Sequence, residues 1–266
     1  MGGIMDLAHF DKAITENYWK LRTLIGSIAL AFPVVLIVVG LCWGLGKYPH
    51  WDLRNIQPTL SDYYYATDPV GNRIDPFPVR LWFCGVLFAV GFFLYKYEGF
   101  SKNESRWLNA AGTFTLGVAV FPMARHGQGP LHDQDLGDWD WVFAWTGWHQ
   151  LSLHGVSAFL AFFCIAVVIV WYADSTLSEL KKPRPACYKW FKTIYRAIAI
   201  IMFGSIIIAI IWHDANYILI AEWCGIWSFA IFWFVKNKEL KEVAKVLKAG
   251  KEPVHPKTKA DLADKL

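Results

Sequence analysis

Charged residues are scarce in this chain, and their scarcity argues against an ordinary soluble domain. Asp, Glu, Lys and Arg make up 18% of the 266 residues, whereas soluble domains average about 25%. Hydrophobic residues supply 55% and aromatic residues 17%. This composition indicates a membrane protein before any segment is considered. The formal net charge of +4 is small, so the placement of the positive residues is more informative than their number.

Cysteine is also sparse, and its spacing excludes two kinds of small scaffold. The five cysteines are Cys42, Cys84, Cys164, Cys187 and Cys224. No two form a CxxC pair, and four lie within apolar runs, so neither a disulfide framework nor a zinc knuckle is predicted. We interpret them as packing residues.

Several catalytic and binding signatures are missing. The sequence has no GxSxG elbow, no P-loop and no GxGxxG turn, and no cofactor is assigned. No long internal repeat is visible, which weakens the prediction of an inverted-repeat transporter. The basic runs flank apolar segments, so no nucleic-acid partner is expected.

Long hydrophobic runs are what the chain does contain. A transmembrane helix needs about twenty mostly apolar residues, and its backbone must satisfy its own hydrogen bonds in lipid. The sequence therefore predicts an all-α, polytopic helical bundle within residues 1–236. Its six transmembrane helices are expected at 24–45, 81–97, 107–123, 145–172, 190–212 and 217–235, the third being the least apolar.

The charges of the connections predict the orientation. Lysine and arginine occur in the connections 98–106 and 173–189 and after residue 235, whereas the connection 124–144 carries four aspartates. The positive-inside rule then places both termini in the cytoplasm and the acidic connection outside. The expected location is the plasma (inner) membrane, with an organellar membrane as the alternative.

The last thirty or so residues are predicted to leave the membrane on the cytoplasmic side. Residues 237–266 begin with an amphipathic pattern in which lysines surround an apolar face. This pattern favours an interfacial helix followed by a flexible tail. A solvated extension of the sixth transmembrane helix is an equal alternative.

Polar and ionisable side chains near the predicted outer ends of the helices are the candidate site. Such groups are expensive within a membrane and usually face protein or water. Gln150, His154 and Ser157 share one helical face, and Arg80 and Glu222 are their expected charged partners. Two interpretations are possible: these residues line an outward-facing polar cavity, or they form a structural network that fixes helix packing. The candidate residues are Ser61, Asp62, Tyr63, Tyr64, Arg80, His149, Gln150, His154, Ser157, His213, Asp214 and Glu222.

The stretch SDYYYATD, residues 61–68, is expected to cover this site from outside. Asp62 is predicted to pair with a cation, either Arg80 or a histidine. The tyrosine rings are predicted to pack on the helix ends while their hydroxyls reach water or headgroups.

A metal site is the alternative use of the outer histidines. His126, His132, His149, His154 and His213 all lie on the predicted outer side. No two of them have the i, i+4 spacing of a helical zinc site, so no metal ligands are assigned.

One family resemblance rests on a series of short motifs between residues 55 and 236. The chain resembles uncharacterised six-span membrane proteins that have an S-x-Y-Y outer loop, an Arg opening the next helix, and a GxFLxxYxG exit. It is distantly similar to the DRAM/Sfk family, which also has an SD loop between its first two spans. The resemblance implies a six-span architecture and no particular activity. The matching positions are Ser61, Tyr63, Tyr64, Arg80, Gly91, Phe93, Leu94, Tyr97, Gly99, His154, Tyr195, Arg196 and Glu222.

A second comparison is with the ceramidase and adiponectin-receptor superfamily of membrane hydrolases, which bind zinc through histidines. Ser61 or Ser157, Asp62, and three histidines (His149, His154 and His213) are the residues that would match. The paired HxxxH of that superfamily and its seventh span are missing here.

Three functional hypotheses follow. The first is a protein without catalytic activity that binds lipids or small molecules, or that is a subunit of a larger membrane complex. The alternatives are a metal-dependent membrane hydrolase and a transporter whose polar path contains Arg80, His154 and Glu222. The expected partners are membrane lipids and other membrane-protein subunits.

Overall fold

The computed structural model describes residues 7–43, 51–65, 79–121, 153–173, 188–211 and 215–248, and these ranges are helical with no strand. The all-α prediction is therefore confirmed for this part of the chain. The long helices are α1 (Leu7–Trp43), α2 (Val79–Lys96), α3 (Lys102–Val120), α5 (Leu153–Val167), α7 (Tyr188–Ile211) and α8 (Ala215–Lys248). The short elements are the 3₁₀ helices η1 (Leu53–Asn55) and η2 (Ser61–Tyr65), and a π-helical segment, η3 (Val168–Tyr172), which continues α5.

Five of the long helices have the length and apolar character needed to cross a membrane. Their spanning segments are Thr15–Cys42, Val79–Lys96, Leu153–Tyr172, Lys189–Ile208 and Ile218–Lys245. The predicted third span coincides with α3, which is a helix but is not among the five. The chain is thus an integral membrane helical bundle.

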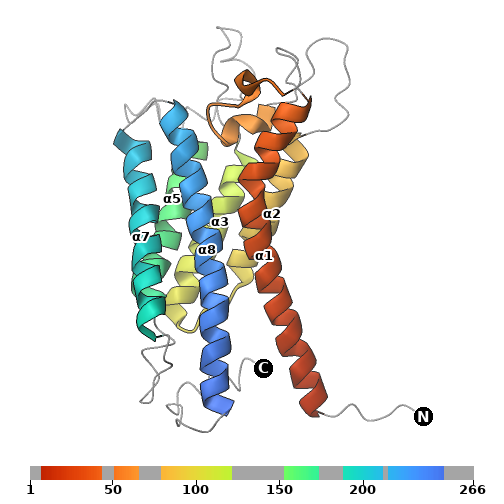
Figure 1. Cartoon of the computed structure of the whole chain (residues 1–266), viewed down its shortest axis with the longest axis vertical. Coiled ribbons are helices and arrows are strands. Elements are labelled where there is room, and N and C mark those ends of the chain that lie inside the picture. Colours follow the sequence, from red (N-terminus) through yellow and green to blue (C-terminus); the bar gives the residue numbers. More distant parts are fainter. Residues whose placement is uncertain are drawn as a thin grey trace, which may run out of the picture.

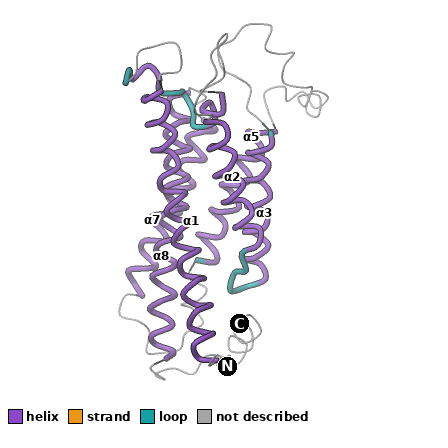
Figure 2. The backbone as a smooth tube through the Cα atoms, turned by 90° about the vertical axis from the view of Figure 1, so that its right-hand side faces the viewer, coloured by secondary structure: helices purple, strands orange, loops and turns teal. Residues whose placement is uncertain are grey.

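The long helices run roughly parallel along the longest axis of the molecule (Figure 1). In this bundle α1 packs against α8 and α2, α2 packs against α3, α3 against α5, and α7 against α8. The beginning of α1 and the end of α8 lie at the same end of the molecule in both views (Figures 1 and 2). We call this end the far end. The opposite end, where residues 51–65 cover α1, α2 and α8, is called the cap end, and residues 51–65 are the cap segment.

The connection between α2 and α3 shows how the chain reverses at the far end. Ser101 is the N-cap of α3, and its hydroxyl accepts a hydrogen bond from the Glu104 backbone N–H at 3.1 Å. The Glu104 carboxylate reaches back to accept from the Phe100 N–H at 2.9 Å. This capping-box arrangement satisfies orphan donors at the start of the helix. It fixes the point at which α3 begins its return toward the cap end.

The cap segment is held by a tyrosine that points into the bundle. Tyr63 is fully buried, and a Cβ atom at Gly40 of α1 would lie only 2.7 Å from its ring. Its hydroxyl accepts a hydrogen bond from the Gln57 N–H at 3.3 Å. The prediction that the hydroxyl of Tyr63 reaches water or headgroups is therefore wrong. The close approach that Gly40 permits allows the ring to enter the bundle, and burial raises the pKa of Tyr63 to about 12.

The last helix is longer than the predicted sixth span. α8 continues without a break to Lys248, so the predicted domain boundary at residue 236 falls inside it. Leu240 and Val243 are buried, and Glu239 is fully buried. The helix continues because this stretch packs against protein. The predicted flexible tail, residues 249–266, lies outside the described residues.

Candidate functional site

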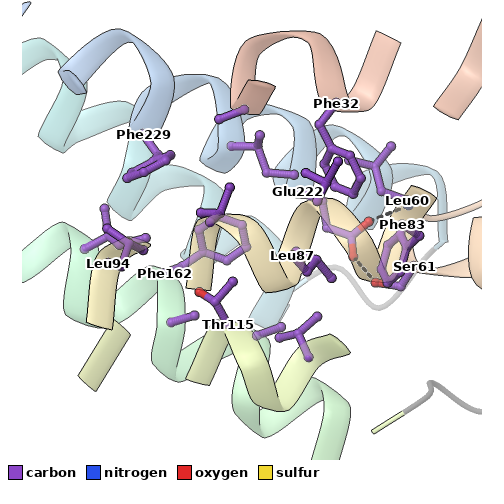
Figure 3. Close-up of a pocket in the computed structure, with 18 residues that line it drawn as sticks. Phe32, Leu60, Ser61, Phe83, Leu87, Leu94, Thr115, Phe162, Glu222 and Phe229 are labelled. Atoms are coloured by element: carbon purple, nitrogen blue, oxygen red, sulfur yellow. Dashed lines mark hydrogen bonds between the residues drawn. The ribbon is translucent and has the colours of Figure 1, made fainter. Parts of the chain in front are cut away.

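A carboxylate from α8 meets the start of the 3₁₀ helix η2 at the cap end. Glu222 accepts a hydrogen bond from the Leu60 backbone N–H at 2.6 Å, and the hydroxyl of Ser61 lies 3.0 Å from its other oxygen (Figure 3). The first N–H groups of a helix have no partner within the helix. Glu222 supplies that partner, although it lies 162 residues from Leu60 in the sequence.

A histidine from α5 joins the same serine. His154 is buried, and its Nε2 atom lies 2.9 Å from Ser61 Oγ. Its Nδ1 atom lies 2.7 Å from the carbonyl oxygen of Phe121, which ends α3. The structure therefore brings α3, α5, α8 and the cap segment together through one hydrogen-bonded chain, Glu222–Ser61–His154.

The protonation of this chain follows from its geometry. A carbonyl oxygen only accepts, so Nδ1 of His154 carries a proton and donates it to Phe121. A serine hydroxyl has one proton and cannot donate to both neighbours. Either Glu222 is protonated and His154 is neutral, or Glu222 is ionised and His154 is an imidazolium. The two arrangements differ only by the position of one proton along the chain.

Arg80 and Asp62 lie in the same region, and each contacts a residue of the cap segment. The Arg80 guanidinium is 4.5 Å from the centre of the Tyr64 ring and donates from Nε to the Tyr64 carbonyl at 3.2 Å. The Asp62 carboxylate accepts from the Thr59 hydroxyl at 3.0 Å, and that hydroxyl accepts from the Asp62 N–H. Glu222 is hydrogen-bonded to the cap segment rather than to Arg80. The expected Arg80–Glu222 pair is replaced because the cap segment brings its own donors to the carboxylate.

A largely apolar cavity of about 100 Å³ lies next to Glu222 and Ser61. Its walls come from α1, α2, α3, α5 and α8, and it extends from Leu60 at the cap end to Leu94 and Phe229 (Figure 3). Thr115 also lines it, but the Thr115 hydroxyl donates to the Ala111 carbonyl of its own helix. Glu222 and Ser61 therefore form the polar end of this cavity.

Ser157 is buried one turn after His154 but has a different neighbour. A Cβ atom at Gly117 of α3 would lie 2.7 Å from the Ser157 hydroxyl oxygen. The small residue on α3 leaves room for the serine between the two helices. Four other candidates, His149, Gln150, His213 and Asp214, lie outside the described residues.

The geometry of His154 also bears on the metal alternative. Both of its ring nitrogens are within hydrogen-bonding distance of protein oxygens, so neither has a lone pair directed at an open position. Among the residues that the structure describes, no group of three or more His, Cys, Asp or Glu side chains could hold a metal ion.

The sequence reasoning missed a buried polar network at the far end. Arg22 of α1 is fully buried and donates from Nε to the Asn237 side chain at 2.5 Å. Its Nη1 atom donates to the hydroxyls of Tyr97 and Tyr18, and its guanidinium lies 4.8 Å from the centre of the Trp233 ring. The sequence signal was the position of Arg22 two residues before the predicted first span.

A buried ion pair stands beside this network. Lys236 lies 2.9 Å from Glu239, and both side chains are almost completely buried. Lys236 also donates to the Ala173 carbonyl at 2.6 Å, and Tyr195 of α7 donates to Glu239. The i, i+3 spacing of the pair was visible in the sequence. Its burial depends on α5 and α7, and the two clusters together fix the far end of the bundle.

Comparisons with protein-family models, with curated proteins and with solved structures found no match to this chain. The class of protein therefore rests on its own fold and apolar helices, which define an integral membrane helical bundle.

Proposed function

We propose that this protein is a six-span membrane protein that binds a small, largely apolar molecule or a segment of a lipid. Its termini are cytoplasmic, and its cap end faces outward. The observation that carries the proposal is the apolar cavity closed at one end by Glu222 and Ser61. Ligand sites are characteristically apolar with a few well-placed polar groups that set orientation.

The six-span part of the proposal is supported by the path of α3. This helix begins next to the α2–α3 turn at the far end, and the carbonyl of Phe121 after its last turn meets His154 at the cap end. It therefore extends between the same two ends as its neighbours. Thr113 and Thr115 donate their hydroxyls to carbonyls of their own helix, which lowers the cost of placing a less apolar helix in lipid.

The size of the cavity limits the buried part of the ligand. An engineered apolar cavity of about 150 Å³ binds benzene, so about 100 Å³ admits a smaller group, such as a short alkyl segment. A hydroxyl or amine on that segment would meet Glu222 and Ser61. A longer ligand would have to extend out of the cavity.

The test is a purification from native membranes in mild detergent, followed by mass spectrometry of the retained small molecules. Ala158 lines the cavity, whereas Ala89 is exposed on α2. We expect Ala158→Leu to abolish retention without lowering thermal stability, because filling a void usually stabilises, and Ala89→Leu to retain the ligand. Retention by Ala158→Leu, or no retained molecule in the wild type, would contradict the proposal. Co-purifying proteins would identify the subunit alternative in the same experiment.

A transport function is the second candidate, and the Glu222–Ser61–His154 chain favours it. Glu222 can pass its proton to Ser61 while Ser61 passes its own to His154, which leaves a carboxylate and an imidazolium. Asp62 is a further carboxyl that acts electrostatically on both end groups. Arg80, which the sequence placed on this path, contacts Tyr64 of the cap segment. Proton uptake by proteoliposomes that is lost in Glu222→Gln would support transport, and uptake that persists in this variant would exclude this path.

A further inference from the structure

α7 packs beside the helix formed by α5 and η3 (Figure 1). A long groove lies between them. Its volume is about 710 Å³. No residue that lines it also lines the cavity next to Glu222, so the groove is independent of the function proposed above. Its described lining comprises Ile169, Val170, Ala173, Lys192, Tyr195, Arg196, Ala199, Ile200, Phe203, Gly204 and Ile207.

The groove is left open by the fold rather than closed by a neighbouring side chain. A Cβ atom built at Gly204 meets no atom within 4 Å. Ile200 is 73% exposed and Ile207 is 51% exposed. The Tyr195 side chain is held at one wall, because its hydroxyl donates to the buried Glu239. An apolar channel of this kind, on a helix that spans a membrane, is in contact with lipid.

The groove runs along most of the membrane-spanning part of α7. Its α7 wall extends from Lys192 to Ile207, which at 1.5 Å per residue is about 22 Å. The spanning segment of α7 is Lys189–Ile208, so the groove begins near the far-end limit of this segment and ends near its cap-end limit.

Among the described lining residues, the charged ones lie toward the far end of the groove. Lys192 and Arg196 are one helical turn apart, and none of the described lining residues is acidic. Arginine binds phosphate oxygens in bidentate geometry, and basic pockets between transmembrane helices on the cytoplasmic side bind anionic headgroups. Beyond Arg196 the described lining of α7 is apolar or small. Positive charge at one end and an apolar channel beyond it are complementary to an anionic lipid.

We propose that the α5–α7 groove binds one anionic glycerophospholipid. Its phosphate lies between Lys192 and Arg196, and an acyl chain follows α7 past Ala199 and Phe203 to Gly204.

The headgroup end is tested by native mass spectrometry of the full chain in micelles doped with equal amounts of phosphatidylglycerol and phosphatidylcholine. The wild type should retain one phosphatidylglycerol at least tenfold over phosphatidylcholine. The double variant Lys192→Gln/Arg196→Gln should lower this preference to near unity. Lys102 and Arg106 are exposed cations with the same i, i+4 spacing at the same end of the bundle, so Lys102→Gln/Arg106→Gln is the matched control and should retain the preference.

The acyl-chain end is tested with two glycine variants. Gly204→Leu places a side chain in the groove, and Gly85→Leu places one on the open face of α2, where a Cβ atom also meets nothing within 4 Å. Leucine is a better helix former than glycine, so neither variant should have a lower melting temperature. Gly204→Leu should reduce lipid retention at least fivefold, and Gly85→Leu should not change it.

Three results would overturn the proposal. Equal losses in the two cation pairs would mean general surface attraction rather than a site. Full retention in Gly204→Leu would remove the acyl chain from the groove. Displacement of the lipid by millimolar inorganic phosphate, with no effect of Gly204→Leu, would mean that Lys192 and Arg196 bind phosphate alone.

Discussion

At the residue scale, Ser61 is the residue on which the cap-end cluster depends. Its hydroxyl lies between the carboxylate of Glu222 and the imidazole of His154. Either protonation state of the chain needs this hydroxyl as both a donor and an acceptor. Loss of a buried hydrogen-bond partner costs about 1–3 kcal/mol when the remaining groups stay desolvated.

Ser61→Ala should therefore lower the free energy of unfolding by about 1–3 kcal/mol, measured by denaturant titration in detergent. Ser205 is the matched control, because it is equally buried but donates only to the Met202 carbonyl of its own helix, at 2.7 Å. Ser205→Ala should cost less than Ser61→Ala. A loss in Ser205→Ala as large as that in Ser61→Ala would contradict a special role for the Ser61 hydroxyl.

The second prediction at this scale concerns the pH response of the cap segment. The Arg54 side chain hydrogen-bonds to Asp52 and lowers the pKa of that carboxyl from 3.8 to about 2. Because the folded-state pKa is depressed, the stabilising contribution of this carboxylate is present above about pH 4 and is lost as the pH falls toward 2. Asp52 is solvent-accessible in this contact, so the effect on overall stability is small.

Arg54→Gln should return the pKa of Asp52 toward its ordinary value. Carboxyl carbon chemical shifts of Asp52, followed by NMR through an acid titration in detergent, measure this pKa directly. Arg106→Gln, which removes an exposed arginine at the far end, is the control and should leave the Asp52 titration unchanged. An unchanged Asp52 titration in Arg54→Gln would show that the contact does not persist in solution.

At the element scale, α2 and α3 approach each other closely through two glycines, Gly91 and Gly112. A Cβ atom at Gly112 would lie 2.5 Å from the Tyr95 nitrogen and 2.6 Å from the Gly91 carbonyl oxygen. Both atoms belong to the backbone, so no side-chain movement can relieve the overlap. Small residues that permit such approach are typical of helix contacts in membranes.

Gly112→Ala should force α2 and α3 apart and destabilise the protein by about 1–3 kcal/mol, the usual cost of overpacking. Gly85→Ala on α2 is the control, since a Cβ atom there meets nothing within 4 Å and alanine is the better helix former by about 1 kcal/mol. The melting temperatures of the two variants in detergent should shift in opposite directions. A neutral Gly112→Ala would mean that the two helices are not held at this distance.

At the scale of the whole molecule, buried polar clusters lie on either side of an apolar middle. Glu222, Ser61 and His154 form the cluster at the cap end, and Arg22 and Lys236 belong to two clusters toward the far end. The residues between them are mainly apolar, including Leu94, Phe229 and Ile165. Polar contacts placed this way join the helices on either side of an apolar middle that matches the hydrocarbon.

The orientation of the molecule is tested with single cysteines in a background that lacks the five native ones. Leu53 is 72% exposed in the cap segment, and Asn103 is exposed in the first turn of α3 at the far end. A membrane-impermeant maleimide should label Leu53→Cys in intact cells, and Asn103→Cys only after permeabilisation, because the basic connections are expected inside. The opposite pattern would reverse the orientation, and labelling of both in intact cells would exclude the predicted crossing of α2.

The predictable part of the fold was the existence and approximate extent of the long helices. The hydrophobic runs predicted both ends of α2 and α7 and the end of α1 to within a few residues, whereas α1 begins at Leu7, well before the predicted start at residue 24. For α8 the predicted span ended at residue 235, because hydropathy falls where Lys236 and Glu239 begin, and an extension of this helix was one of two alternatives for the residues that follow. In the structure these charged side chains are buried against α5 and α7. The hydropathy of the sequence alone predicts that they are exposed to solvent, because it contains no information about neighbouring helices.

For the candidate site, the sequence predicted which residues take part but not how they pair. Burial cost alone identified Ser61, His154 and Glu222 as residues in need of partners. The same cost suggested that Arg80 pairs with Glu222, because a pair of opposite charges is the simplest arrangement that compensates both. Glu222 is instead hydrogen-bonded to the cap segment, which brings the Leu60 N–H and the Ser61 hydroxyl next to its carboxylate. A backbone N–H group is present at almost every residue, so the sequence does not indicate which one will donate to a distant carboxylate.

The sequence by itself determined that this is an all-helical membrane protein, because apolar runs of about twenty residues can satisfy their backbone groups in lipid only as helices. It also determined which polar groups are costly enough to require partners. Only the tertiary structure decided what those partners are, that Arg22 and the Lys236–Glu239 pair are buried, and that a groove remains open beside α7. These features depend on contacts between residues far apart in the chain, and such contacts are set by helix packing rather than by local composition.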